Sequence, residues 1–299
     1  MSIIENAIDK LRRATPATPG TAPGPASHVS PEGGRDAAIG VAPIVPHRRI
    51  RIDLNLLRAQ GEMPEAGQER RFADYYREVK RPLIQRALAA DARPESRLIM
   101  ISSALPGEGK TFTALNLALS IARERDVSVL LVDADAPKGH LSRAFGIQDE
   151  PGLLDALADE ALDVESLVLG TDLKGLELLP AGRAAEGAAS ELIASVRMAQ
   201  IAARLTGRHP RRLVLFDSAP LLLSSEARAL KQIPGQILIV TRAGRTPRQA
   251  LLDAIALIDK TKLHGLVLND AHVASGDGYS DYYGYYGHDG AGGQAPGSR

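Results

Sequence analysis

The stretch Leu98-Ile-Met-Ile-Ser-Ser-Ala-Leu-Pro-Gly-Glu-Gly-Lys-Thr111 decides the fold of this chain. It joins an apolar strand to a helix through a glycine-rich loop, which directs successive backbone N–H groups toward one point beside a helix N-terminus. Such a loop binds phosphate and is called a P-loop. The sequence departs from the usual pattern at Ala104, which stands where the first glycine is expected.

The residue types of this loop predict an ATP site. Gly107 and Gly109 supply backbone freedom, Lys110 is expected to reach the β- and γ-phosphate oxygens, and the Thr111 hydroxyl is placed to bind Mg²⁺. We therefore predict ATP and Mg²⁺ as ligands. The nucleotide-binding residues expected in and after the loop are Pro106, Gly107, Glu108, Gly109, Lys110, Thr111 and Phe112.

Acidic residues end two later apolar runs. The first is Val129-Leu-Leu-Val-Asp133-Ala-Asp135, and the second is Leu213-Val-Leu-Phe-Asp217-Ser-Ala-Pro220. Acids at strand ends are common, but one helix separates Lys110 from the first run, and a right-handed crossover brings both strand ends to the same sheet edge. Asp133 and Asp135 are expected beside the γ-phosphate, where one accepts a proton from an attacking hydroxyl. The predicted catalytic residues are Lys110, Asp133 and Asp135, and the predicted metal ligands are Thr111, Asp133 and Asp217.

Residues 97–273 read as an α/β domain. Apolar runs at 98–101, 127–132, 176–179, 213–216, 236–240 and 265–268 predict strands, and the stretches 110–125, 151–158, 189–206, 225–232 and 247–260 predict helices. Continuous apolar strands that alternate with helices are typical of a mostly parallel sheet covered on both faces. We therefore expect a fold like that of P-loop NTPases.

Three segments precede this domain. Residues 1–13 predict an amphipathic helix, which docks on its own domain, on a partner or on a membrane surface. Residues 14–47 are rich in Pro, Ala and Gly and predict a disordered linker. Residues 48–96 are expected to be mainly helical, with Asp53 capping a short helix that ends before Gly61 and a second helix from about Gln68 that Pro82 interrupts or restarts.

The C-terminal segment, residues 274–299, is rich in glycine and predicts a flexible tail. Five of the seven tyrosines of the chain fall in it, within eight consecutive residues. Glycines and aspartates surround them, so a hydrophobic core does not explain them. A sticky low-complexity tail is one interpretation, and a cluster of phosphate acceptors is the other. The candidate acceptors are Tyr279, Tyr282, Tyr283, Tyr285 and Tyr286.

Composition limits the remaining possibilities. The chain has 36 basic and 36 acidic residues, so its net charge gives no reason to expect a nucleic-acid partner. It has no cysteine, which excludes disulfides and thiolate chemistry. It also lacks a secretory signal and any uncharged apolar run of about 18 residues, so we expect a cytoplasmic protein.

These features, in this order, resemble the bacterial tyrosine autokinases, or BY-kinases, of exopolysaccharide synthesis. The likeness is strongest to the separately encoded, cytoplasmic type that accompanies exosortase (XrtA) systems, and it includes Met1-Ser-Ile-Ile-Glu-Asn-Ala-Ile-Asp-Lys-Leu11 and Tyr76-Arg-Glu-Val-Lys-Arg-Pro-Leu83. The resemblance implies ATP-dependent phosphorylation of the tail tyrosines, between neighbouring subunits of a ring, and contact between Asn269 and adenine. It also implies a membrane polysaccharide co-polymerase (a Wzz-like chain-length determinant) as activating partner, a tyrosine phosphatase, and a place at the inner face of the plasma membrane.

The sequence departs from the family pattern at two places. The second motif of the family often continues with an arginine where this chain has Pro137, followed by Lys138. The oligomerisation helix of the family often carries a glutamate and two arginines at three-residue steps. Here Glu78 and Arg81 fit, but Ile84 replaces the second arginine.

Two other functions compete with an autokinase. One is a positioning ATPase of the MinD/ParA type, whose loop carries a lysine where this chain has Leu105 and whose chain ends in a basic amphipathic helix. The other is a non-catalytic adaptor that binds nucleotide as a switch, for which the same P-loop would serve.

Overall fold

The computed structural model describes residues 48–136, 138–183, 185 and 187–271. The helix predicted at 1–13, the linker at 14–47 and the tail with its tyrosines lie outside the described residues. All that follows concerns the unit that begins at Pro43. None of the helices in the described ranges is long and apolar enough to cross a bilayer.

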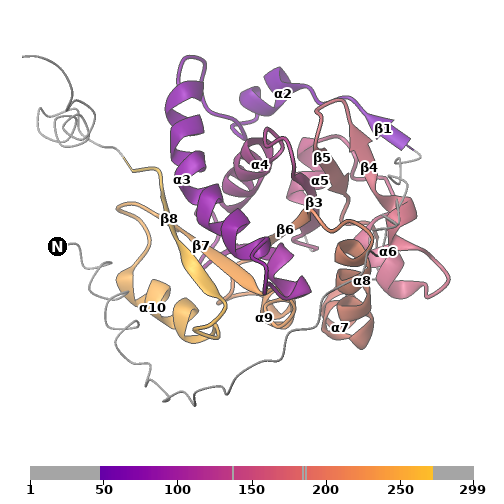
Figure 1. The fold of residues 1–299 in the computed structure, drawn as a ribbon. Coiled ribbons are helices and arrows are strands. Elements are labelled where there is room, and N and C mark those ends of the chain that lie inside the picture. Colours follow the sequence, from indigo (N-terminus) through magenta and orange to yellow (C-terminus); the bar gives the residue numbers. More distant parts are fainter. Residues whose placement is uncertain (1–47, 137, 184, 186, 272–299) are drawn as a thin grey trace, which may run out of the picture. The chain divides into compact units, whose positions relative to one another are not determined.

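An eight-stranded sheet forms the centre of this unit (Figure 1). Neighbouring strands run parallel except β4 and β5, which are antiparallel. From one edge to the other, the order is β1 (Arg48–Ile50), β4 (Leu169–Thr171), β5 (Leu176–Leu179), β3 (Ser128–Ala134), β6 (Arg212–Ser218), β2 (Leu98–Ser103), β7 (Gln236–Arg242) and β8 (Leu263–Asn269). The prediction of a mostly parallel sheet is confirmed.

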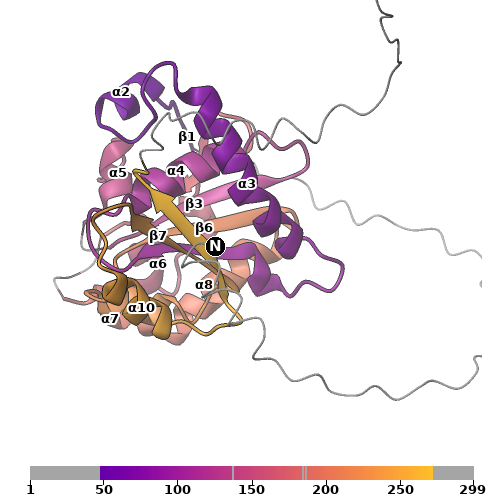
Figure 2. The same ribbon diagram turned by 90° about the vertical axis from the view of Figure 1, so that its left-hand side faces the viewer.

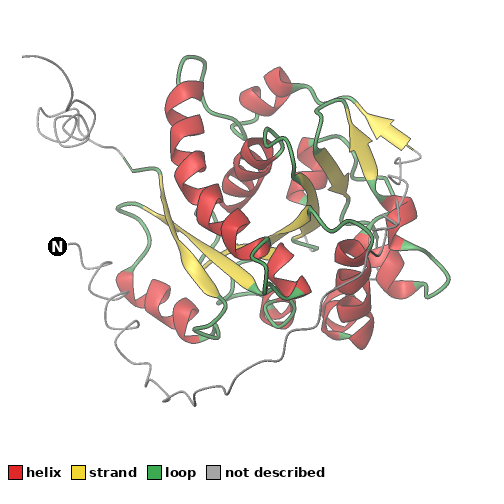
Figure 3. Cartoon of the chain, in the orientation of Figure 1, coloured by secondary structure: helices red, strands yellow, loops and turns green. Residues whose placement is uncertain are grey.

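Helices cover both faces of the sheet (Figures 2 and 3). The buried strands point alternate side chains to opposite faces. In β2, for example, Ile99 and Ile101 belong to one apolar cluster, and Leu98 and Met100 to the other. The first cluster packs against α2 (Leu54–Ala59), α3 (Glu69–Ala87), α4 (Lys110–Ile121) and α5 (His140–Ala144), and the second against α6 (Leu153–Ala158), α7 (Ala189–Ala194), α8 (Val196–Gly207), α9 (Ser225–Leu230) and α10 (Arg248–Ala256).

The lead-in segment differs from its prediction in two ways. It starts with β1, whose two arginines hide it from a search for apolar runs, and it ends in the 3₁₀ turn Pro94–Arg97, which the sequence did not predict. The two helices between them, α2 and α3, follow as expected. Asp53 does cap α2, since its carboxylate accepts from Asn55 N at 2.9 Å and from Leu56 N at 3.0 Å.

The predicted break at Pro82 is wrong, because α3 runs through it. Proline removes one helical hydrogen bond and normally kinks a helix. Here the buried Gln236 of β7 donates to the carbonyl of Leu83 at 3.1 Å and to that of Ser96 at 2.6 Å. On the N-terminal side of Pro82, Lys80 donates to the carbonyl of Ser120 at 2.7 Å. Tertiary contacts thus hold α3 on both sides of the proline, to β7 on one side and to α4 on the other.

Other elements were missed or divided. The sequence did not predict β4 or the short α5, and the helix expected at 189–206 is two helices that meet at Ser195. Ser195 has an extended backbone with φ of −72° and ψ of 158°, and its hydroxyl bonds the carbonyl of Leu192 at 2.6 Å. A serine that bonds the backbone locally competes with the helix, which explains the break. The turn Val164–Leu167 precedes β4.

Candidate functional site

The loop between β2 and α4 has the backbone geometry that a P-loop needs. Gly107 and Gly109 have φ of 75° and 90°, a region that glycine enters without steric cost. Besides its positive φ, Gly109 has a steric reason to be glycine, because a Cβ there would lie 1.9 Å from Asn269 Nδ2. The helix begins at Lys110, so the amides of the loop and of the first turn face one region, as expected for phosphate binding.

The side chain of Glu108 is engaged by other protein groups, so the predicted contact of this residue with nucleotide would be made by its backbone. Glu108 is only 3% exposed, and its carboxylate accepts from Leu105 N at 2.7 Å and from the Thr246 hydroxyl. The carboxylate therefore closes the loop on itself and ties it to the segment after β7. Only the backbone of Glu108 remains available to a nucleotide.

The structure brings the predicted acids together. Asp133 and Asp217 are register partners on β3 and β6, and β6 lies between β3 and the strand that leads into the P-loop. Both are buried, at 1% and 0% exposure. Burial, and next the charge of Asp133, raise the pKa of Asp217 well above its usual range, against the opposing effects of Thr111 and Lys110. Lys110, Thr111 and both carboxylates thus converge at one end of the sheet.

The two carboxylates differ in their hydrogen bonds. Asp133 Oδ2 accepts from Ser142 N at 2.7 Å and from the Ser142 hydroxyl at 2.6 Å, which fixes its orientation. Burial raises the pKa of Asp133 although Ser142 opposes the shift. Asp133 Oδ1 and both oxygens of Asp217 have no hydrogen-bond partner of standard geometry among the described residues, although the Thr111 hydroxyl lies close enough to Asp217 to lower its pKa.

These orphaned oxygens fit a hard cation. Buried polar atoms normally have partners, and Mg²⁺ prefers oxygen ligands. In the described ranges no group of three or more His, Cys, Asp or Glu side chains is arranged to hold an ion by itself. Mg²⁺ usually takes one or two protein carboxylates and completes its octahedron with phosphate oxygens and water, so Asp133 and Asp217 supply enough carboxylates for such a site.

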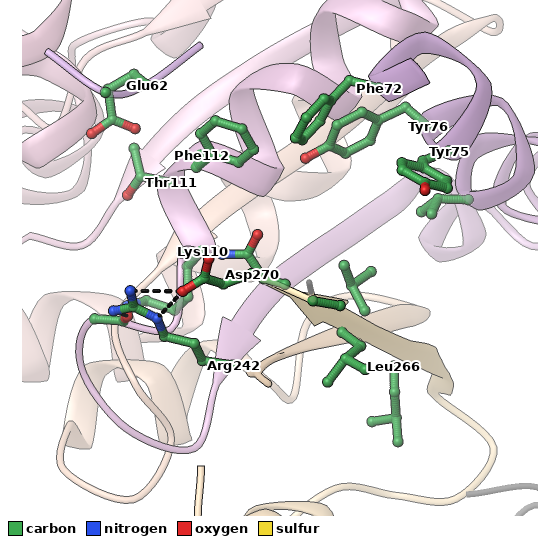
Figure 4. Close-up of a pocket in the computed structure, with 18 of the residues that line it drawn as sticks. Glu62, Phe72, Tyr75, Tyr76, Lys110, Thr111, Phe112, Arg242, Leu266 and Asp270 are labelled. Atoms are coloured by element: carbon green, nitrogen blue, oxygen red, sulfur yellow. Dashed lines mark hydrogen bonds and ion pairs between the residues drawn. The ribbon is translucent and has the colours of Figure 1, made fainter. Parts of the chain in front are cut away.

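An open cavity of about 1270 Å³ lies against the P-loop. Figure 4 shows Lys110, Thr111 and Phe112 of the P-loop and α4 together with Phe72, Tyr75 and Tyr76 of α3, with Phe112 next to Phe72. Phe72 contacts Phe112 edge to face with ring centroids 5.8 Å apart, so α3 packs directly on the first turn of α4. Of the predicted site residues, the cavity is lined by Pro106, Gly107, Gly109, Lys110, Thr111, Phe112, Asp135 and Asn269.

The ends of β7 and β8 support the loop. Asn269 Nδ2 donates to the carbonyl of Glu108 at 3.0 Å. Arg242 Nε and Nη2 lie 2.8 Å from Asp270 Oδ2, and Arg242 Nη1 lies 3.4 Å from the carbonyl of Gly107 (Figure 4). Asn269 was expected from the family resemblance, whereas Arg242, Thr246 and Asp270 were not expected, since a single polar residue after an apolar run carries no distinctive pattern.

A strand, a glycine loop with its lysine, and acids at the ends of the neighbouring strands define a P-loop ATPase domain. Residues 96–266 match the family model described as AAA domain. The chain is 31% identical over 195 residues to tyrosine-protein kinase YwqD of Bacillus subtilis, and the matched region covers 64% of this chain and 78% of YwqD. The chain therefore belongs to the bacterial tyrosine kinase family.

Two further relatives support this assignment. The succinoglycan biosynthesis transport protein ExoP of Rhizobium meliloti is 34% identical over 221 residues, or 71% of this chain and 27% of ExoP. The chain thus spans about a quarter of that relative. The kinase domain of the Escherichia coli tyrosine kinase ETK superposes with a TM-score of 0.57 and 26% identity, over 69% of this chain and 80% of that domain.

Proposed function

We propose that this chain is an ATP- and Mg²⁺-dependent tyrosine autokinase that phosphorylates Tyr279, Tyr282, Tyr283, Tyr285 and Tyr286 of its own tail. The observation that carries the proposal is the convergence of Lys110 and Thr111 with the unpartnered carboxylate oxygens of Asp133 and Asp217. The family relatives named as tyrosine kinases supply the choice of phenol as acceptor.

Each site residue has a role in the proposed transfer. A phenol oxygen attacks the γ-phosphorus, the bond to the β-phosphate oxygen breaks, and ADP leaves with the electron pair. Lys110 stabilises the charge on the phosphate oxygens. Asp135 accepts the phenol proton, because it lines the cavity whereas Asp133 is fixed by Ser142. Thr111, Asp133 and Asp217 would hold Mg²⁺, which neutralises phosphate charge when bound.

Asn269 is proposed as the adenine contact. It lines the cavity and its amide nitrogen is engaged by the carbonyl of Glu108. That bond fixes the orientation of the side chain, so its oxygen can act as an acceptor for the exocyclic amine of adenine.

The wider setting follows from the family. We propose that the protein works at the inner face of the plasma membrane with a membrane polysaccharide co-polymerase as activator, a tyrosine phosphatase as antagonist, and a self-associated ring as the active form. Exopolysaccharide export, in an exosortase-associated system, is the proposed process. The name of ExoP, a succinoglycan biosynthesis transport protein, supports the link to polysaccharide.

Incubation with Mg-ATP, alone and with the cytosolic part of the co-polymerase, followed by mass mapping of the tail, tests the activity. We expect phosphate on tail tyrosines, and its loss in Lys110→Met and Asp135→Asn. Unmodified tyrosines under both conditions would refute the kinase. Nucleotide-dependent dimerisation without tail phosphate would favour a MinD/ParA-type ATPase, and polymer export that survives Lys110→Met would favour an adaptor.

A further inference from the structure

The cavity continues from the P-loop into a groove between α3 and β8. We call it the α3–β8 groove, and it is lined by Phe72, Tyr75, Val79, Leu266, Val267 and Leu268. Tyr75 and Leu268 are 49% and 51% exposed, which is high for large apolar side chains. The whole cavity, at about 1270 Å³, exceeds the roughly 300–1,000 Å³ of ordinary ligand pockets, so a nucleotide leaves the groove available.

The strand side of the groove is an edge rather than a face. Three consecutive residues of β8 line it, whereas side chains on one face of a strand alternate. β8 is the last strand of the sheet and pairs with β7 along its inner side, and within the described residues no strand pairs with its outer side. The outward N–H and C=O groups of such an edge accept an added strand.

The chain itself leaves the described residues at this groove. Ala271 lines the same cavity, and Asp270 beside it is held by Arg242, which also contacts the P-loop carbonyl of Gly107 (Figure 4). The segment 272–299 therefore starts from a fixed point at one end of β8. The tyrosine cluster, residues 279–286, follows after a linker long enough for a reversal of direction.

We propose that residues 279–286 of the same chain dock in the α3–β8 groove as a strand added to β8. At about 3.3 Å per residue the cluster spans about 26 Å, against about 23 Å for the seven residues of β8. Aromatic pairs with Phe72 and Tyr75 supply apolar contact. Arg71, which lies 5.6 Å from the centre of the Tyr75 ring, offers a positive charge to Asp277 and Asp281 of the tail.

Docking would make the tail sensitive to its own modification. A phosphate adds nearly two negative charges and must be hydrated, and Glu78, which lines the same cavity, repels it. Several phosphates on the tail carry more charge than the single Arg71 can neutralise. Phosphorylation then releases the tail. This step rests on the proposed kinase function, whereas the docking of the unmodified tail does not.

Hydrogen exchange without nucleotide tests the docking separately from catalysis. Amides of β8 are compared between the full chain and a chain that ends at Ala271, with amides of β2 as a control for folding. We expect exchange in β8 to be about tenfold slower in the full chain, at every protein concentration. Equal exchange in both chains would overturn the proposal. Protection that disappears on dilution would also overturn it, because a second copy would then be the occupant.

Substitutions identify the contacts. Changing all five tail tyrosines to Phe keeps the rings and should keep the protection, while changing them to Glu should abolish it. Tyr75→Ser should weaken the protection. Val196 is 78% exposed at the start of α8, on the other face of the sheet, so Val196→Ser is the control and should leave the protection unchanged. If the Phe and Glu tails exchange alike, docking is wrong. A chain without docking that still gains tail phosphate would leave the proposed function intact.

Discussion

At the scale of single residues, Glu108 shows how the P-loop keeps its shape without its first glycine. Ala104 is fully buried, and the loop is closed instead by the Glu108 carboxylate on Leu105 N. Thr246 and Asn269 then fix Glu108 from outside, through its carboxylate and its carbonyl. The loop amides are therefore oriented before any phosphate arrives, which lowers the ordering cost of binding.

Glu108→Ala tests this. Without the carboxylate the loop loses two hydrogen bonds, and we expect the dissociation constant for Mg-ATP to rise about tenfold, equivalent to about 1.4 kcal/mol. Glu108→Gln keeps one acceptor and should show a smaller increase, as should Thr246→Val. Titration calorimetry measures all three, with Asp253→Ala on the exposed surface of α10 as the matched control. Unchanged affinity in Glu108→Ala would mean that the loop is held by its backbone alone.

Asp217→Asn tests the cost of the buried acid. The raised pKa of Asp217 means that between its usual range and the raised value the folded chain binds more protons than the unfolded chain. The free energy of unfolding should therefore fall as the pH rises through that window. Asp217→Asn should weaken this dependence, leaving the part that comes from the raised pKa of Asp133, and should stabilise the nucleotide-free protein at neutral pH by about 1–3 kcal/mol while abolishing phosphotransfer. Urea unfolding at several pH values decides it, and a variant less stable than the parent at pH 7 would contradict the argument.

The candidate site was predictable from the sequence where its residues follow a characteristic spacing or end an apolar run. Gly107, Gly109 and Lys110 follow a recognisable spacing, and Asp133 and Asp217 end apolar runs whose order in the sheet follows from crossover rules. The orientation of Glu108 was not predictable, because it depends on Thr246, which is distant in the sequence. The α3 side of the cavity was missed for the same reason, since Phe72 and Tyr75 read only as the apolar side of a helix.

At the scale of elements, buried strands were found from the sequence and edge elements were not. β2, β3, β6 and β7 are apolar on both faces and read as continuous runs. β1 and β4 have three residues each, which is too short for a recognisable apolar run, so their strand conformation comes from pairing with their neighbours. The course of α3 through Pro82 depends in the same way on a residue of another element, Gln236.

Gln236→Leu should therefore destabilise the domain. Its amide serves the carbonyls of Leu83 and Ser96, and a leucine would leave both without a donor in a fully buried place. We expect the free energy of unfolding to fall by about 1–3 kcal/mol. Pro82→Ala is the counterpart, because it restores a helical N–H and should stabilise α3. Chemical denaturation of the two single variants and the double variant measures whether the effects are coupled, and a neutral Gln236→Leu would show that water replaces the amide.

At the scale of the whole molecule, the two faces of α3 differ in composition. Its buried side carries Tyr76, Lys80 and Leu83, of which Tyr76 and Leu83 belong to the apolar cluster between α3 and the sheet. Glu78 and Arg81, which match the oligomerisation pattern of the family, are exposed and form no ion pair with described residues. Ile84, which replaces the second arginine of that pattern, packs against the core cluster. The replacement therefore removes one charge from the surface and adds apolar contact inside the domain.

This division predicts how a ring would respond to substitution. If α3 forms the subunit contact, Arg81→Glu should shift the protein to monomers in sedimentation velocity, and Glu78→Arg combined with Arg81→Glu should recover part of the association, because the charges are exchanged as a pair. Ile84→Arg should not strengthen association; it should lower stability, since a charge would enter the packed side of α3. Arg93→Glu, exposed beyond the helix, is the control. Arg81, Ile84 and Arg93 do not line the nucleotide cavity, whereas Glu78 does. The single variant Arg81→Glu should therefore bind ATP as the parent does, and an Arg81→Glu protein that loses both association and nucleotide would place the ring contact at the P-loop rather than on α3.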